Sequence, residues 1–164
     1  MADDGVDRIL EQWARERPDL DTQAMGVFGR ILRIAKAAGD AATATYARFG
    51  ITRGDFDVLA TLRRAGEPFA LSPSALSASL MLTSGGITQR VDRLDQAELV
   101  ARAPDPSDRR RQIVALTPKG RQLIDAAVAA GLDTQQHLLE PLPPDTRREL
   151  DRCLRQLLAA VAGS

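Results

Sequence analysis

The chain has 164 residues, of which 44% are hydrophobic, and its 22 basic and 22 acidic side chains cancel to a formal net charge of zero. This length fits one domain, or one domain with added oligomerisation helices, that buries a core without disulfides. The one cysteine, Cys153, excludes an intramolecular disulfide framework, and one cysteine with one histidine makes no convincing zinc site.

The sequence also excludes several classes of protein. No run approaches the roughly 18 apolar residues of a membrane span, and the acidic N-terminus lacks the apolar stretch of a signal peptide. We therefore expect a cytoplasmic protein with no membrane partner. Because the sequence has no nucleophile–base pair, metal cluster or phosphate-binding glycine loop, we expect no enzyme, no metal and no cofactor.

Helical periodicity marks the N-terminal third of the chain. Val6, Leu10 and Trp13 lie on one face of a predicted helix over about 3–17, which Pro18 ends. A longer amphipathic helix is predicted over about 21–46.

Three short helices and a hairpin follow in close succession. Thr52 and Asp55 have the spacing of a capping box, Ser72 precedes Pro73 as an N-cap, and Thr83 caps a third helix. After it, "LVAR" and "RQIVAL" flank the turn "PDPSDR" and predict a two-stranded hairpin with a long tip. This order is that of a winged helix-turn-helix, whose third helix enters the major groove of DNA.

Two further helices complete the predicted fold. Thr117 and Pro118 repeat the N-cap signature and begin a helix reaching about Leu139, and "PLPP" ends it. A last helix carries Leu150, Leu154, Leu157 and Val161 on an apolar stripe. Because Cys153 lies on that stripe, we expect a buried, inert thiol rather than a peroxide sensor.

Positive charge is concentrated on the predicted DNA-binding unit. Between Ser84 and Ile124 there are eight basic and five acidic side chains, whereas the rest of the chain is net negative. Such a local excess is the electrostatic signature of a nucleic-acid-binding surface.

The segment "DPSDRRRQIVALTPKG" resembles the D-x-D-R-R wing and following L-T-x-x-G of the MarR family of transcriptional regulators. "LSPSALSASLMLTSGGITQRVDRL" is similar to the helix-turn-helix of that family. The resemblance implies a mainly helical fold with a small hairpin wing and an obligate homodimer on a pseudo-palindromic operator in double-stranded DNA. It implies N-terminal helices over 1–50, a DNA-binding unit over 51–117 and C-terminal dimerisation helices over 118–164.

One position departs from the family pattern. Where the family usually has a glycine at the end of the recognition helix, this chain has Glu98. A left-handed backbone there would cost on the order of 1 kcal/mol for a residue with a side chain, so we expect the helix to end through a tighter turn.

The chemistry of the side chains suggests which residues contact DNA. Short or bidentate hydrogen-bonding groups at the start of the recognition helix suit base edges, and the start of the preceding helix suits phosphates. The predicted contacts are Ser72, Ser74, Thr83, Ser84, Thr88, Gln89, Arg93, Arg109, Arg110 and Arg111. By resemblance, Asp108 pairs with one wing arginine to stiffen the tip, while Arg109 or Arg110 enters the minor groove.

The extra N-terminal helix resembles that of the urate-responsive subfamily, which includes PecS-like and trans-aconitate-responsive regulators. The subfamily's effector residues fall on Trp13, Asp57, Arg90 and Arg102 of this chain. The resemblance thus implies a ligand-responsive repressor released by a small anion, either a urate-like purine or a tricarboxylate.

Simpler interpretations remain open. Trp13 could anchor its helix, Asp57 and Arg90 could form a surface ion pair, and Arg102 could contact phosphate. The alternative functions are a winged-helix protein-interaction module and a regulator of the same family with no urate-like ligand.

Overall fold

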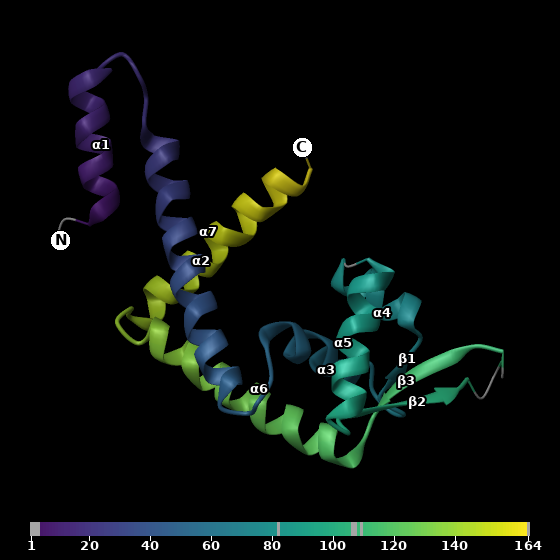
Figure 1. Ribbon diagram of the computed structural model, residues 1–164. Coiled ribbons are helices and arrows are strands. Elements are labelled where there is room, and N and C mark those ends of the chain that lie inside the picture. The colour runs from purple at the N-terminus through teal and green to yellow at the C-terminus, as the bar shows by residue number, and fades with distance from the viewer. Residues whose placement is uncertain (1–3, 82, 106–107, 109, 164) are drawn as a thin grey trace. The chain divides into compact units, whose positions relative to one another are not determined.

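A computed structural model describes residues 4–81, 83–105, 108 and 110–163. The described elements, in chain order, are α1 (Gly5–Glu16), α2 (Gln23–Ala47), α3 (Arg53–Arg64), β1 (Ala70–Leu71), α4 (Pro73–Leu80), α5 (Ser84–Gln96), β2 (Val100–Pro104), β3 (Gln112–Leu116), α6 (Pro118–Leu139) and α7 (Pro144–Ala162) (Figure 1). The predicted order of helices and hairpin is confirmed. Among the described residues, no helix is long and apolar enough to cross a membrane.

The chain divides into two compact units, Met1–Ala41 and Ala42–Ser164, and the boundary falls inside α2. In the first unit, Asp4 and Asp7 form a capping box at the start of α1. Both carboxylates also accept hydrogen bonds from Arg30 on α2. The buried side chain of Val6 packs against Gly29, where an added methyl group would lie 3.2 Å from it. Charge pairing and close packing therefore join α1 to α2.

Side-chain caps fix the helix starts of the second unit. The Thr52–Asp55 capping box begins α3, Ser72 caps α4, and Thr83 caps α5. Thr117 caps α6 through the N–H of Gly120, at 2.9 Å. These caps are where the sequence predicts them, because hydroxyl and carboxylate oxygens satisfy the free N–H groups of a first helical turn.

The wing is an antiparallel sheet with the strand order β1-β3-β2. Strands β2 and β3 pair over their full lengths, and in Figure 1 they extend away from α5. The structure adds one strand to the predicted hairpin: Ala70 pairs with Ala115, and Leu71 pairs with Val114. β1 ties the segment before α4 to the wing.

The core of the second unit lies where α3, α4 and α5 meet the sheet and α6. Its largest fully buried side chains are Leu59, Leu62, Leu76, Ile87, Leu94, Ile124, Val58, Val100 and Val114. Because α5 buries its apolar face here, its polar face points away from the core.

Two expectations are wrong. Glu98 has a φ of 59°, so the recognition helix does end through a left-handed residue. The 2.9 Å hydrogen bond from the N–H of Leu99 to the carbonyl of Leu94 closes this helix end in the manner of a glycine-containing cap. Cys153 is exposed rather than buried, because α7 buries none of its residues within the chain.

Candidate nucleic-acid interface

The recognition helix α5 presents a polar surface at its N-terminal end. Thr83 accepts a hydrogen bond from the N–H of Gly86 at 3.3 Å, and Thr88 and Gln89 are exposed. Ser84 is the first residue of the helix, and its side chain lies outside the described part of the structure. The predicted base-reading residues thus follow the cap along the first two turns, where a helix can approach base edges.

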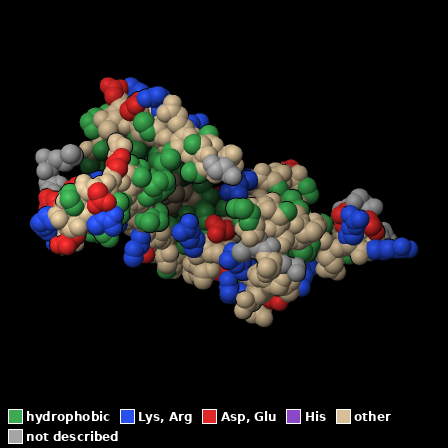
Figure 2. Space-filling model, turned by 90° about the horizontal axis from the view of Figure 1, so that it is seen from above, with side chains coloured by type: hydrophobic (Ala, Val, Ile, Leu, Met, Phe, Trp, Pro, Cys, Tyr) green, Lys and Arg blue, Asp and Glu red, His purple; other side chains and the backbone are tan. Residues whose placement is uncertain are grey.

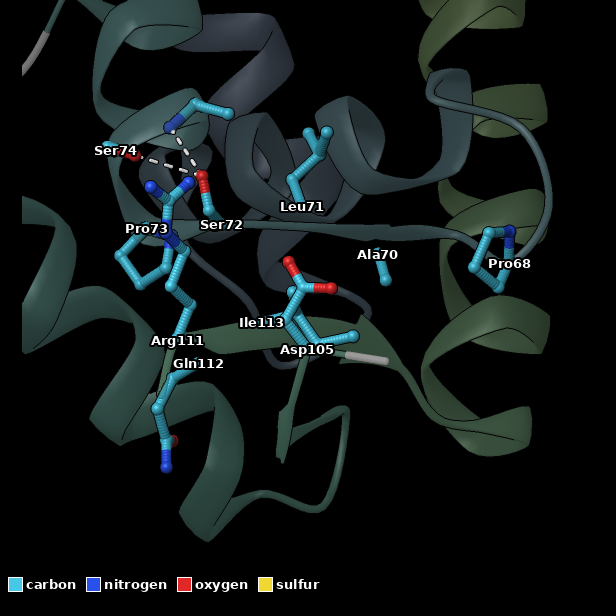
Figure 3. A pocket seen from close by; sticks show the side chains of 11 residues that line it. Pro68, Ala70, Leu71, Ser72, Pro73, Ser74, Asp105, Arg111, Gln112 and Ile113 are labelled. Carbon is cyan, nitrogen blue, oxygen red and sulfur yellow. Dashed lines mark hydrogen bonds between the residues drawn. The ribbon is translucent and has the colours of Figure 1, made fainter. Parts of the chain in front are cut away.

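A hollow of about 850 Å³ lies between the start of α4 and the wing (Figure 3). Ser72, Ser74 and Arg111 all line it, and the Arg111 side chain extends toward the two serines. The Ser72 and Ser74 hydroxyls are 2.9 Å apart, and Ser72 also caps α4. Three predicted contacts therefore meet at one concave surface, where hydroxyls and a guanidinium can bind an anion. The Asp105 carboxylate also lines this hollow.

Asp108 organises the described part of the wing tip. Its carboxylate lies 3.4 Å from the Arg111 guanidinium and accepts a 3.1 Å hydrogen bond from the N–H of Arg110. Its carbonyl accepts a 2.8 Å bond from the N–H of Arg111. The Arg110 side chain is exposed, whereas Arg109 lies outside the described residues. Figure 2 shows basic and acidic side chains next to each other at this tip.

Arg93 is bound to a buried carboxylate. It donates from Nε and Nη2 to Asp55 at 3.1 and 2.5 Å, and Asp55 is 3% exposed. Burial alone would raise the pKa of Asp55, but hydrogen bonds from Arg93 and Thr52 outweigh it and hold the pKa below its ordinary value of 3.8. This pair joins the start of α3 to the recognition helix. The Arg93 guanidinium therefore stabilises the fold, whether or not it also contacts a DNA phosphate.

The predicted effector residues occupy three places. Trp13, which is 40% exposed, belongs to the first unit. Arg90 donates to the carbonyl of Gly54 at 3.3 Å on α3, the helix that carries Asp57. No ion pair forms between Arg90 and Asp57, both of which the structure describes.

Arg102 instead forms an ion pair with Asp92 of α5. Arg90 and Asp92 lie roughly 160° apart around the helix, since successive residues turn by about 100°. Arg90 therefore projects from one side of the recognition helix, and Arg102 contacts the opposite side.

Two functional contacts were not predicted from the sequence. The sequence predicts Asp55 only as a helix cap, and its link to Arg93 joins residues 38 positions apart. Asp92 had no assigned role, and its pairing with Arg102 follows from the path of β2 beside α5. For the Asp55–Arg93 contact, the sequence signal is the capping position of Asp55. For the Asp92–Arg102 contact, the sequence gives no signal.

Comparisons with known proteins agree with this architecture. A model of the MarR family matches residues 49–111, which run from just before α3 to the wing tip. The HTH-type transcriptional regulator PecS of Dickeya dadantii is 36% identical over 156 residues, which are 95% of this chain and 92% of PecS.

Solved structures give the same result. A mutant MarR from Escherichia coli complexed with operator DNA aligns with a TM-score of 0.67 and 25% identity, over 89% of this chain and 97% of that one. AbsC, a MarR family regulator from Streptomyces coelicolor, has the same fold, with a TM-score of 0.74 at 22% identity, over 88% and 98% of the two chains. The chain therefore belongs to the MarR family of DNA-binding transcriptional regulators.

Proposed function

We propose that the protein binds a pseudo-palindromic operator as a homodimer and acts as a repressor. Each copy places α5 in a major groove, sets the hollow of Ser72, Ser74 and Arg111 on the phosphate backbone, and reaches along the duplex with its wing. Two recognition helices then have to lie about 34–36 Å apart to meet successive turns of one DNA face.

The observation that carries this proposal is the hollow between α4 and the wing. Its lining brings two hydroxyls and one guanidinium together from segments almost forty residues apart in the sequence. The similarity to PecS along nearly the whole chain supports the regulatory role, as does the fold shared with the operator-bound MarR mutant.

DNA binding is tested by removing wing charge. We expect Arg109→Ala or Arg110→Ala to weaken binding to every duplex and to lower the slope of log affinity against log salt by about 1. The matched control is Arg17→Ala, which removes the same charge from an exposed pair with Asp19, after α1 and outside the DNA-binding unit. Fluorescence anisotropy at several salt concentrations gives both quantities. Unchanged affinity and slope in both wing variants would overturn the wing contact and favour a protein-interaction module.

We further propose that a small anion relieves repression. The predicted contacts are Trp13, which would stack against the ligand, and Arg102, which would pair with its charge. Asp57 and Arg90, on the α3 side of α5, would respond to the ligand charge. The resemblance to the urate-responsive subfamily and the identity to PecS support this.

The ligand response is tested with urate, citrate and trans-aconitate. We expect at least one of them to release the DNA complex in a gel-shift assay, and Trp13→Phe and Arg102→Ala to retain DNA binding but respond less. If all three anions leave the wild-type complex intact, the protein is a MarR-type regulator without a urate-like ligand.

A further inference from the structure

We propose that Asp92 is an internal anion that competes with the effector for Arg102, and that its release carries the ligand signal to the recognition helix. This inference rests on the proposed ligand response and says how ligand binding would affect the recognition helix. It assigns a role to a residue on α5 that neither reads a base nor contacts the ligand in the predicted site.

The contact itself spans the two DNA-binding elements. Asp92 lies on α5, and Arg102 lies in the middle of β2, opposite Val114 of β3. The Arg102 Nη2 donates to the Asp92 carboxylate. Because strand β2 is part of the wing, this ion pair connects the recognition helix directly to the wing.

Arg102 also lines a pocket of about 310 Å³ between α5 and the wing. Ile87 and Val91 of α5 and Val114 of β3 form apolar walls. Among the lining residues that the structure describes, Arg102 alone carries a charge. Thr88 and Gln112 add polar groups to the lining, so the pocket suits a compact polar anion, and the guanidinium that would bind that anion is the one that Asp92 holds.

The ion pair between Arg102 and Asp92 is weak enough for a ligand anion to replace Asp92. The side chains of Arg102 and Asp92 are 39% and 51% exposed, so each can return to water at little cost. Such exposed pairs contribute only about 0.2–1 kcal/mol, whereas a carboxylate ligand can bind a guanidinium through two parallel hydrogen bonds. A bound anion would also repel the Asp92 carboxylate, which is fixed to α5.

The direction of coupling follows from this competition. A ligand shifts a conformational equilibrium only through unequal binding to its states. Here the anion binds the state in which Asp92 has left Arg102, so α5 and the wing lose this ion pair when the ligand arrives. Without the Asp92 charge, the anion should bind more tightly but affect DNA binding less.

The test compares Asp92→Asn with Asp95→Asn, a matched control on the same helix with an exposed carboxylate that pairs with no arginine among the described residues. Calorimetry with urate, citrate and trans-aconitate gives ligand affinity, and anisotropy with and without the anion gives the change in operator affinity. For Asp92→Asn we expect ligand affinity to rise by roughly 1.4- to fivefold, the range that an exposed ion pair provides, and the ligand-induced loss of DNA affinity to shrink. Asp95→Asn should match the wild type in both.

The outcomes separate the two proposals. If the wild type responds to an anion but Asp92→Asn binds that anion no more tightly, or responds fully, the role of Asp92 is overturned and the ligand response stands. A purely structural role would weaken ligand and DNA binding together, which also overturns it. If none of the three anions binds the wild type or either variant, the ligand response and this inference are overturned together.

Discussion

Asp55 is buried, and hydrogen bonds within the chain satisfy its carboxylate oxygens. It caps α3 with Thr52, accepts two bonds from Arg93, and is 3% exposed. A buried carboxylate of this kind is stable only while its partners are present, because an unpaired charge in the core is costly. Asp55 thereby fixes the recognition helix to α3 at one point.

We expect Asp55→Asn to lower the free energy of unfolding by about 2 kcal/mol at pH 7, since it weakens a cap and a charge-assisted pair. Because the folded pKa of Asp55 is depressed, its contribution is present above its ordinary pKa of 3.8 and is lost as pH falls through the folded pKa. Urea unfolding at pH 7 and pH 3 measures this. The difference between wild type and variant should shrink at pH 3, and a constant difference would refute the ionic role.

Glu98 occupies a left-handed position that costs a residue with a Cβ atom on the order of 1 kcal/mol. Its carboxylate lies 3.3 Å from the Lys119 ammonium, an exposed contact that contributes little. The carbonyl groups of Ala97 and Glu98 accept bonds from Lys119 and Thr117 at 2.8 and 2.7 Å. Contacts from the start of α6 therefore hold this turn in place of a glycine.

We expect Glu98→Gly to raise the free energy of unfolding by about 0.5–1 kcal/mol, because glycine adopts this backbone without strain. Glu98→Ala is the control, since it removes the carboxylate but keeps the Cβ atom, and it should be neutral or slightly destabilising. Chemical unfolding followed by circular dichroism measures both. Equal stability of the two variants would show that the backbone at this position carries no strain.

At the scale of elements, the helices could be predicted because each has a local signature. Thr52, Ser72, Thr83 and Thr117 stand at the expected caps, and apolar residues repeat at helical spacing. Strand β1 could not be predicted, because two residues show no alternation and their pairing with β3 depends on the fold. The Arg102–Asp92 pair could not be predicted either, because it also depends on how the strands pack in the fold.

Two glycines near the DNA-binding unit have opposite roles. A methyl group at Gly120 would lie 1.8 Å from the carbonyl oxygen of Leu99, so α6 approaches the end of the recognition helix too closely for any side chain. A methyl group at Gly85 would meet no described atom within 4 Å beyond its chain neighbours and the backbone of its own helix. Only Gly120 is thus required for packing, and Gly85 keeps a bare backbone where α5 would approach DNA.

We expect Gly120→Ala to lower the free energy of unfolding by roughly 2–3 kcal/mol through overpacking. Gly85→Ala should raise it by about 0.5 kcal/mol through helix propensity, yet weaken operator binding by preventing close approach. Thermal unfolding and anisotropy on both variants measure the two effects. If Gly85→Ala binds the operator as tightly as the wild type, this turn of α5 does not face DNA.

At the scale of the whole molecule, α7 makes no extensive contact with the rest of the described chain. None of its residues is buried, and Leu150, Leu154, Leu158 and Val161 are all among the exposed large apolar residues. Their spacing places them on one stripe, and such a stripe is stable when another surface covers it. Cys153 beside the stripe is exposed for the same reason.

We therefore expect a solution mass of about twice 17.7 kDa. Leu158→Glu should shift the protein toward the monomer, because Leu158 is 67% exposed in the single chain and a charge there would be buried in the dimer. Gln156→Glu adds the same charge roughly 160° away around α7 and is the matched control. Light scattering after size-exclusion chromatography measures the mass.

The affinity for the operator should depend on whether the protein is a monomer or a dimer. A monomer engages one half-site at a time, so it loses the gain in effective concentration that links the two recognition helices. Leu158→Glu should therefore bind a full operator about as weakly as a single half-site, whereas Gln156→Glu should still favour the full operator. If Leu158→Glu stays dimeric and Gln156→Glu does not, the second copy covers the other face of α7, and the apolar stripe has a different partner.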